Sequence, residues 1–132
     1  MVCLDTTILA DVIRKQPEAI RKLKTLSEVN KTFSTTIINI AELFYGACKS
    51  NNVKQGKEDV NLIISRFTLL EMDEKSAGRY GQIRSKLQAT GQIIPDRDLM
   101  IAAIALSEGE NIIVTRNKKD FSRIPNLTVE TY

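Results

Sequence analysis

The feature that most constrains the fold is a run of eight consecutive apolar residues, 99–106, which follows Pro95, Asp96 and Asp98. Pro95 can set the entry angle of a helix, and we expect Asp96 to be its N-cap. Asp98 falls in the first turn, where the helix dipole favours negative charge. A helix that is apolar on all sides has no face for solvent, so a sheet and other helices must cover it. Capping alone could account for both acids.

Stretches with strand character alternate with helical patterns along the chain. We expect strands at 2–5, 31–36, 68–72, 111–115 and 127–130, and helices at 6–15, 17–26, 37–49, from within 50–58 to 67, 73–91 and 94–106. Such alternation predicts a parallel sheet that is covered on both faces. We therefore predict an α/β fold, a three-layer α/β/α sandwich with a central parallel sheet, formed by residues 1–132 as a single domain.

The sequence contains no histidine, which excludes several kinds of site. A histidine general base, a Ser-His-Asp triad, a Cys-His dyad and an ordinary zinc site are all impossible. Cys3 and Cys48 have no metal-ligand spacing and form no disulfide framework, so we expect reduced structural thiols. Residues 1–5 lack the pattern of a signal peptide or a membrane span, and we expect a cytoplasmic protein.

The net charge is only +3, but the basic residues are clustered. Such clusters are commonly solvated faces; if several converge beside an acidic site, they can instead hold a polyanion. The clusters are Arg14-Lys15, Arg21-Lys22 with Lys24, Arg84 with Lys86, and Arg116 with Lys118, Lys119 and Arg123.

Acidic residues stand where the predicted fold would form a site. Asp5 ends the first strand, and ligands of open α/β sheets bind at the carboxyl ends of strands, although a helix N-cap is the alternative for Asp5. Glu42 lies inside an apolar helix, so its carboxylate must be paired with a cation such as Lys or Arg, exposed on a narrow polar seam, or bound to a metal ion. Asp120 and Asn117 follow the strongest strand, where Asp120 could also be a surface or turn acid.

Asp5, Glu42, Asp98 and Asp120 together suit a hard ion with oxygen ligands, and Mg²⁺ or Mn²⁺ fits better than zinc or copper. Such an ion activates water and stabilises the charge that develops on a phosphodiester. The acids therefore predict metal-assisted phosphodiester hydrolysis. The basic clusters would attract a nucleic acid backbone that the carboxylates alone would repel.

Four ordered motifs resemble the PIN-domain ribonucleases, specifically the VapC-type toxins of toxin–antitoxin pairs. They are Leu-Asp-Thr-Thr at 4–7, Ile-Ala-Glu-Leu-Phe-Tyr-Gly at 40–46, Pro-Asp-Arg-Asp-Leu-Met-Ile-Ala-Ala at 95–103 and Val-Thr-Arg-Asn-Lys-Lys-Asp-Phe-Ser-Arg-Ile-Pro at 114–125. The likeness spans nearly the whole chain. One departure is Thr7, where most relatives have an asparagine.

The resemblance implies a role for each matching residue. The three principal metal-binding acids fall on Asp5, Glu42 and Asp98, and a fourth, more variable position falls on Asp120, with Asn117 as a polar alternative. The supporting positions are Asp96, Thr6 and Thr115. Asp96 matches an acid that only some members carry, and Thr6 lies beside Asp5. Thr115 matches a hydroxyl often found beside the metal. The resemblance also implies cleavage of RNA with Mg²⁺ or Mn²⁺, a homodimer, and inhibition by a VapB-type antitoxin.

Two other functions fit the same residues. A DNA or structure-specific nuclease would use the same metal chemistry. A catalytically inert module that binds nucleic acid or a partner protein would keep the acids as caps. We favour a ribonuclease toxin, with apolar helix surface that includes Phe44 and Tyr45 available for the antitoxin.

Overall fold

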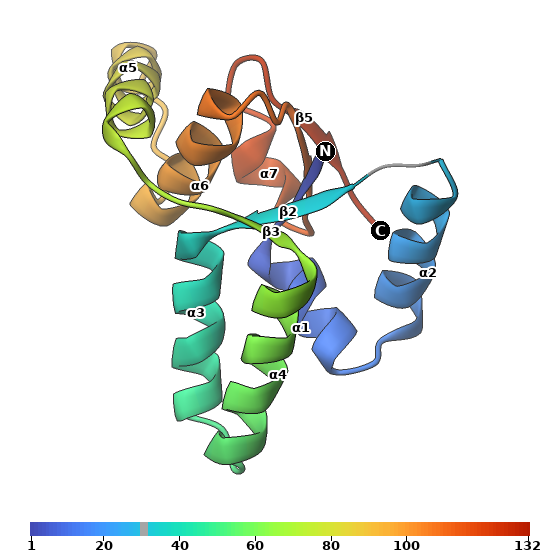
Figure 1. The fold of residues 1–132 in the computed structure, drawn as a ribbon. Coiled ribbons are helices and arrows are strands. Elements are labelled where there is room, and N and C mark those ends of the chain that lie inside the picture. The colour runs from blue at the N-terminus through green and yellow to red at the C-terminus, as the bar shows by residue number, and fades with distance from the viewer. Residues whose placement is uncertain (30–31) are drawn as a thin grey trace.

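The computed structural model describes residues 1–29 and 32–132, and within them strands and helices alternate as expected (Figure 1). The elements are β1 (Val2–Leu4), α1 (Thr6–Ile13), α2 (Pro17–Glu28), β2 (Phe33–Thr36), α3 (Ile37–Cys48), α4 (Val53–Arg66), β3 (Thr68–Leu70), α5 (Glu74–Ala89), α6 (Asp96–Ser107), β4 (Ile112–Val114), α7 (Lys118–Phe121) and β5 (Thr128–Glu130). Lys31, which we expected in the second strand, lies outside the described residues. The short helix α7 was not predicted.

The central sheet is parallel throughout, with the strand order β3-β2-β1-β4-β5. This confirms the predicted architecture. From β1 the chain builds outward to β2 and β3, and then crosses back to β4 and β5 on the other side of β1. The strand order therefore reverses between β1 and β4, and ligands bind outside the carboxyl ends of strands at such a point.

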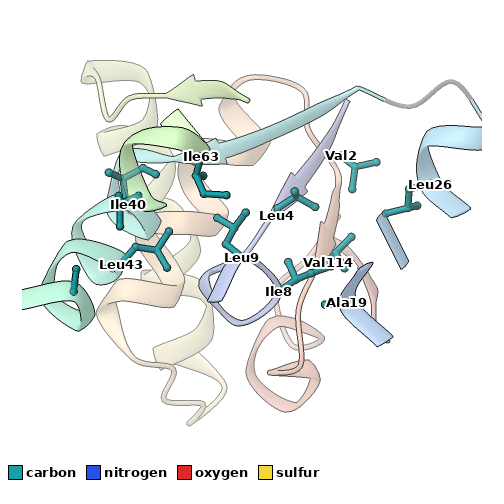
Figure 2. Close-up of a cluster of buried hydrophobic side chains, with 12 residues drawn as sticks. Val2, Leu4, Ile8, Leu9, Ala19, Leu26, Ile40, Leu43, Ile63 and Val114 are labelled. Atoms are coloured by element: carbon teal, nitrogen blue, oxygen red, sulfur yellow. The ribbon is translucent and has the colours of Figure 1, made fainter. Parts of the chain in front are cut away.

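Successive side chains of each strand point to opposite faces of the sheet, and each face has its own core. Val2 and Leu4 of β1 pack with residues of α1 to α4, whereas Cys3 between them packs with residues of α5, α6 and α7. Figure 2 shows the first core, with Ile40 and Leu43 of α3 at one end and Leu26 of α2 at the other. Two helical layers therefore enclose the sheet.

The apolar run forms α6, in which every side chain from Ile101 to Ala105 is fully buried. No helix in the described part of the chain is both long and apolar enough to cross a membrane.

The prediction for Asp96 was wrong. The helix begins at Asp96 itself, Pro95 occupies the N-cap position, and no side chain caps the helix. The Asp96 carboxylate instead accepts a hydrogen bond from the Tyr80 hydroxyl at 3.0 Å and pairs with Arg84 at 3.4 Å.

Helices α3 and α4 approach each other closely at Gly56. A Cβ atom added there would lie 2.8 Å from Cβ and 3.1 Å from Cα of Ala47. We expect Gly56→Ala to lower the free energy of unfolding by about 1 to 3 kcal/mol, because overpacking outweighs the better helix propensity of alanine. Chemical denaturation measures the change.

Gly78 of α5 is the matched control, since a Cβ atom added there meets nothing within 4 Å. Gly78→Ala should raise the free energy of unfolding by about 0.5 to 1 kcal/mol. Equal effects of the two substitutions would contradict the close approach at Gly56.

Candidate active site

Asp5 follows β1 directly and is almost completely buried beside two hydrogen-bond donors. Thr115, which follows the neighbouring strand β4, donates its hydroxyl to Asp5 Oδ2 at 2.6 Å. Asn39 of α3 donates its amide to Asp5 Oδ1 at 2.9 Å. Asp5 is also the N-cap residue of α1, but its side chain makes no capping hydrogen bond. Both carboxylate oxygens are thus held in a fixed orientation by parts of the chain that are remote in sequence.

Thr7, the departure from the family pattern, takes part in the same network. Its hydroxyl accepts a hydrogen bond from the Arg116 backbone N–H at 3.0 Å and lies 3.3 Å from the Thr115 hydroxyl. The Thr115 hydroxyl in turn accepts from the Asn117 backbone N–H at 2.9 Å. Threonine at position 7 therefore orders the surroundings of Asp5 through the turn that follows β4.

Glu42 lies on α3 and is partly buried, with 23% of its side chain exposed. Its Oε1 accepts a hydrogen bond from the Thr6 hydroxyl at 2.8 Å, and its Oε2 pairs with Nη1 of Arg97 at 3.0 Å. The carboxylate in the apolar helix is thus paired with an arginine, one of the alternatives that the sequence left open. The Arg97 side chain is mostly exposed, so solvent screens this ion pair.

Asn117 connects the two remaining acids. Its amide donates to Oδ2 of Asp98 at 2.9 Å and to Oδ2 of Asp120 at 3.3 Å. Asp98 lies in the first turn of α6, as predicted, whereas Asp120 lies on α7. The other oxygen of Asp120 is paired with Arg123, one turn further along the chain.

These acids surround one pocket of about 500 Å³ at the carboxyl ends of β1 and β4. The lining residues are Asp5, Thr6, Thr7, Ala10, Asp11, Arg14, Glu42, Pro95, Arg97, Asp98, Arg116, Asn117 and Asp120. Thr115 does not line the pocket, but its hydroxyl donates to Asp5, which does. Asp96 does not line it and instead borders a separate cavity beside Arg84.

The donor set of the pocket fits a hard divalent ion, because it offers carboxylate oxygens and no histidine. Among residues 1–29 and 32–132, no three acidic or cysteine side chains are already gathered closely enough to hold a metal ion. Each carboxylate instead faces a donor of its own: Thr115 and Asn39 for Asp5, Thr6 and Arg97 for Glu42, Asn117 for Asp98, and Arg123 for Asp120. In this arrangement the acids are not positioned to share one ion.

Burial raises the pKa values of two of the acids, and repulsion from neighbouring acids raises one of them further. The pKa of Asp98 is raised to about 6, first by burial and then by the negative charges of Asp5, Asp120 and Glu42, while Arg97 acts in the opposite direction. Burial also raises the pKa of Asp5, and the hydrogen bond from Thr115 is the largest opposing effect. A bound cation would relieve both effects.

The pKa of Asp98 makes the stability of the metal-free protein depend on pH. Because this pKa is higher in the folded protein than the ordinary 3.8, the folded state holds more protons between these two values, and stability falls as pH rises through that window. We expect Asp98→Asn to raise the free energy of unfolding at about pH 7.5 by about 1 kcal/mol, after allowance for the screening of a half-buried group. Thermal unfolding of both proteins in the presence of a chelator measures this difference in stability.

The control is the same comparison at about pH 4, where Asp98 is largely protonated and the substitution should change stability little. Saturating Mg²⁺ at neutral pH should stabilise the unsubstituted protein more than the Asp98→Asn variant. A stability difference between the two proteins that is the same at both pH values would contradict the raised pKa.

Two residues that hold the acids of the site were missed from the sequence. Asn39 is fully buried; besides its bond to Asp5, it donates to the Thr6 hydroxyl at 3.0 Å and accepts from the Thr36 backbone N–H at 3.2 Å. A buried amide inside an apolar run is unfavourable without hydrogen-bond partners, and that was the available signal. Arg97 stands between two acids in the sequence, and nothing local indicated that it would pair with Glu42.

Comparisons with known proteins give one consistent result. Residues 2–127 match the PIN domain. The chain is 36% identical over 129 residues to ribonuclease VapC2 of Rickettsia felis, and 36% identical over 129 residues to the tRNA(fMet)-specific endonuclease VapC of Salmonella typhimurium; both alignments cover 98% of this chain and 96% of the relative. The crystal structure of VapBC2 from Rickettsia felis bound to a promoter DNA fragment contains a chain that is 35% identical, with a TM-score of 0.89 and coverage of 100% of this chain and 99% of that chain.

Proposed function

The chain belongs to the PIN-domain family, and on that premise we propose that it is a metal-dependent ribonuclease toxin of the VapC type. The observation that carries the proposal is the single pocket at the strand-order reversal, to which four separate segments contribute Asp5, Glu42, Asp98 and Asp120. In a chain without histidine, such carboxylates can act on a phosphodiester by binding a divalent ion.

These four acids would hold Mg²⁺ or Mn²⁺. The bound ion would lower the pKa of water and stabilise negative charge on the phosphodiester that is hydrolysed. Thr115 and Asn39 fix the orientation of the Asp5 carboxylate, and Asn117 orients Asp98. Thr6 and Arg97 hold Glu42 at the edge of the pocket. Outer contacts of this kind determine how well acidic ligands bind a metal.

Isothermal titration calorimetry with Mn²⁺ distinguishes Asp120 from Asp96 as a ligand. Asp120→Asn should weaken binding by about tenfold or more, because it removes a charged oxygen donor from the pocket. Asp96→Asn removes the same charge outside the pocket and serves as the matched control, with unchanged affinity. Equal affinities of the Asp120→Asn variant and the parent would exclude Asp120 from the metal site.

The RNA specificity is tested by digestion of single-stranded RNA and single-stranded DNA of the same sequence, with Mg²⁺, with Mn²⁺ and with a chelator. We expect cleavage of RNA alone, and only with a metal ion. Cleavage of DNA at a comparable rate would favour the DNA nuclease. Cleavage of neither polymer, together with no binding of Mn²⁺, would favour the inert module.

A second groove, of about 600 Å³, supports a protein partner. It runs between α3 and α4, where it is lined by Leu43, Tyr45 and Val60, and it shares Glu42 and Arg97 with the acidic pocket. A segment of a VapB-type antitoxin that lies in this groove would reach the active site. Co-purification with a small protein encoded beside this chain would support the partner, and the proposal includes a homodimer in the cytoplasm.

A further inference from the structure

Arg116 lies at the rim of the acidic pocket and is held by two remote residues. Its Nε pairs with Oδ2 of Asp11 on α1 at 3.2 Å, and its guanidinium carbon lies 4.2 Å from the centroid of the Tyr132 ring. The Tyr132 hydroxyl donates to the same Asp11 oxygen at 2.6 Å. With the backbone bond to Thr7, these contacts fix the guanidinium before any ligand arrives.

The contact to Asp11 uses Nε, and within residues 1–29 and 32–132 the two terminal amino groups of the guanidinium make no hydrogen bond, so they can bind another acceptor. The Arg116 side chain is 48% exposed. A guanidinium that is already ordered loses little conformational freedom on binding, and its planar fork matches two oxygens of a phosphate. The stacked tyrosine adds a cation–π contact that supports this orientation.

The surrounding charges favour an anion at this position. Arg14 also pairs with Asp11, at 3.5 Å, so that two guanidinium groups share one carboxylate and the cluster carries a net positive charge. The hydrogen bond from Tyr132 is the largest effect that lowers the pKa of Asp11, which therefore stays ionised. Arg14, Asp11 and Arg116 line the same pocket as the metal-binding acids. A polyanion that approaches the acidic centre meets this positive edge first.

We propose that Arg116, positioned by Asp11 and Tyr132, binds a phosphate of the RNA strand next to the phosphodiester that is cut. This inference rests on the proposed function. The acids of the pocket repel a nucleic acid backbone, so the strand needs a cationic contact at their edge. Asp11 and Tyr132 are positioning residues that act through Arg116.

The test measures binding of a labelled single-stranded RNA by fluorescence anisotropy at several salt concentrations, with Asp98→Asn as a non-cleaving parent. Adding Arg116→Gln should weaken binding about tenfold. It should also reduce the slope of log affinity against log salt by about 0.7 to 1, the value for one phosphate contact. Arg116→Lys should keep the slope but lose part of the affinity. In the cleaving enzyme, Arg116→Gln should raise KM and leave kcat nearly unchanged.

Three further variants separate a phosphate contact from a purely structural role. Arg66→Gln is the matched control, because Arg66 is exposed at the end of α4, away from the pocket, and its loss should leave the salt slope of the parent unchanged. Tyr132→Leu removes the stacked ring and should weaken RNA binding, while Tyr132→Phe keeps the ring and should weaken it less. A lower melting temperature without a change in slope would mean that the cluster only stabilises the fold.

Unchanged affinity and unchanged slope for Arg116→Gln, with RNA still bound by the parent, would overturn this inference and leave the proposed ribonuclease intact. If the wild-type protein neither binds nor cleaves RNA, the proposed function itself fails. Circular dichroism verifies that each variant is folded. If Arg116→Gln is not folded, RNA binding by Arg116→Lys is compared with that of the parent instead.

Discussion

Asp98→Asn is expected to lower kcat/KM for RNA cleavage by about 100-fold or more while the protein stays folded. The substitution keeps the shape of the side chain and an oxygen that can accept the hydrogen bond from Asn117. It removes the negative charge that a divalent ion requires, and it relieves the repulsion from Asp5 and Asp120. Cleavage of a labelled RNA under single-turnover conditions measures the loss.

Asp5→Asn and Glu42→Gln should act in the same direction, because each removes one charged oxygen from the same pocket. Asp96→Asn is the control, since Asp96 lies two residues away on α6 but outside the pocket. Full activity of Asp98→Asn, or equal losses for Asp98→Asn and Asp96→Asn, would refute the assignment of the site.

Phe121→Ala is expected to lower the free energy of unfolding by about 3 to 5 kcal/mol. Phe121 is fully buried in the second core, where it fixes α7 beside Ile113 and Ile124. A domain of this size has a total stability of only about 5 to 15 kcal/mol, so the loss is a large part of it. Because α7 carries Asp120 and follows Asn117, the variant should also bind Mn²⁺ more weakly at temperatures where it remains folded.

Urea denaturation measures the loss of stability, and the m-value should stay constant if the unfolding remains two-state. Tyr45→Ala is the control, because Tyr45 is also a helical aromatic residue but is 68% exposed; its loss should change stability by less than about 0.5 kcal/mol. A comparably small effect of Phe121→Ala would show that α7 does not depend on this side chain.

Most of the fold could be predicted because its signals are local. The apolar run of α6 and the proline at the start of α2 both act within a few residues. The four-residue helix α7 could not be predicted, because so short a segment has no periodicity. Its place is determined by the burial of Phe121. Asp96 was assigned as a cap because aspartate is favoured there, but contacts with Tyr80 and Arg84 from α5 hold it instead.

The candidate site could likewise be predicted only in part. The sequence by itself predicted the proposed chemistry, because the absence of histidine and the acids at strand ends and helix starts favour ligation of a hard metal ion. It also determined the parallel sheet, through the alternation of strands and helices. Only the tertiary structure decided which groups hold each acid: Asn39 and Thr115 on Asp5, Arg97 on Glu42, and Tyr132 on the Asp11 that positions Arg116. These partners are far apart in sequence, and they meet at the carboxyl ends of the neighbouring strands β2, β1 and β4.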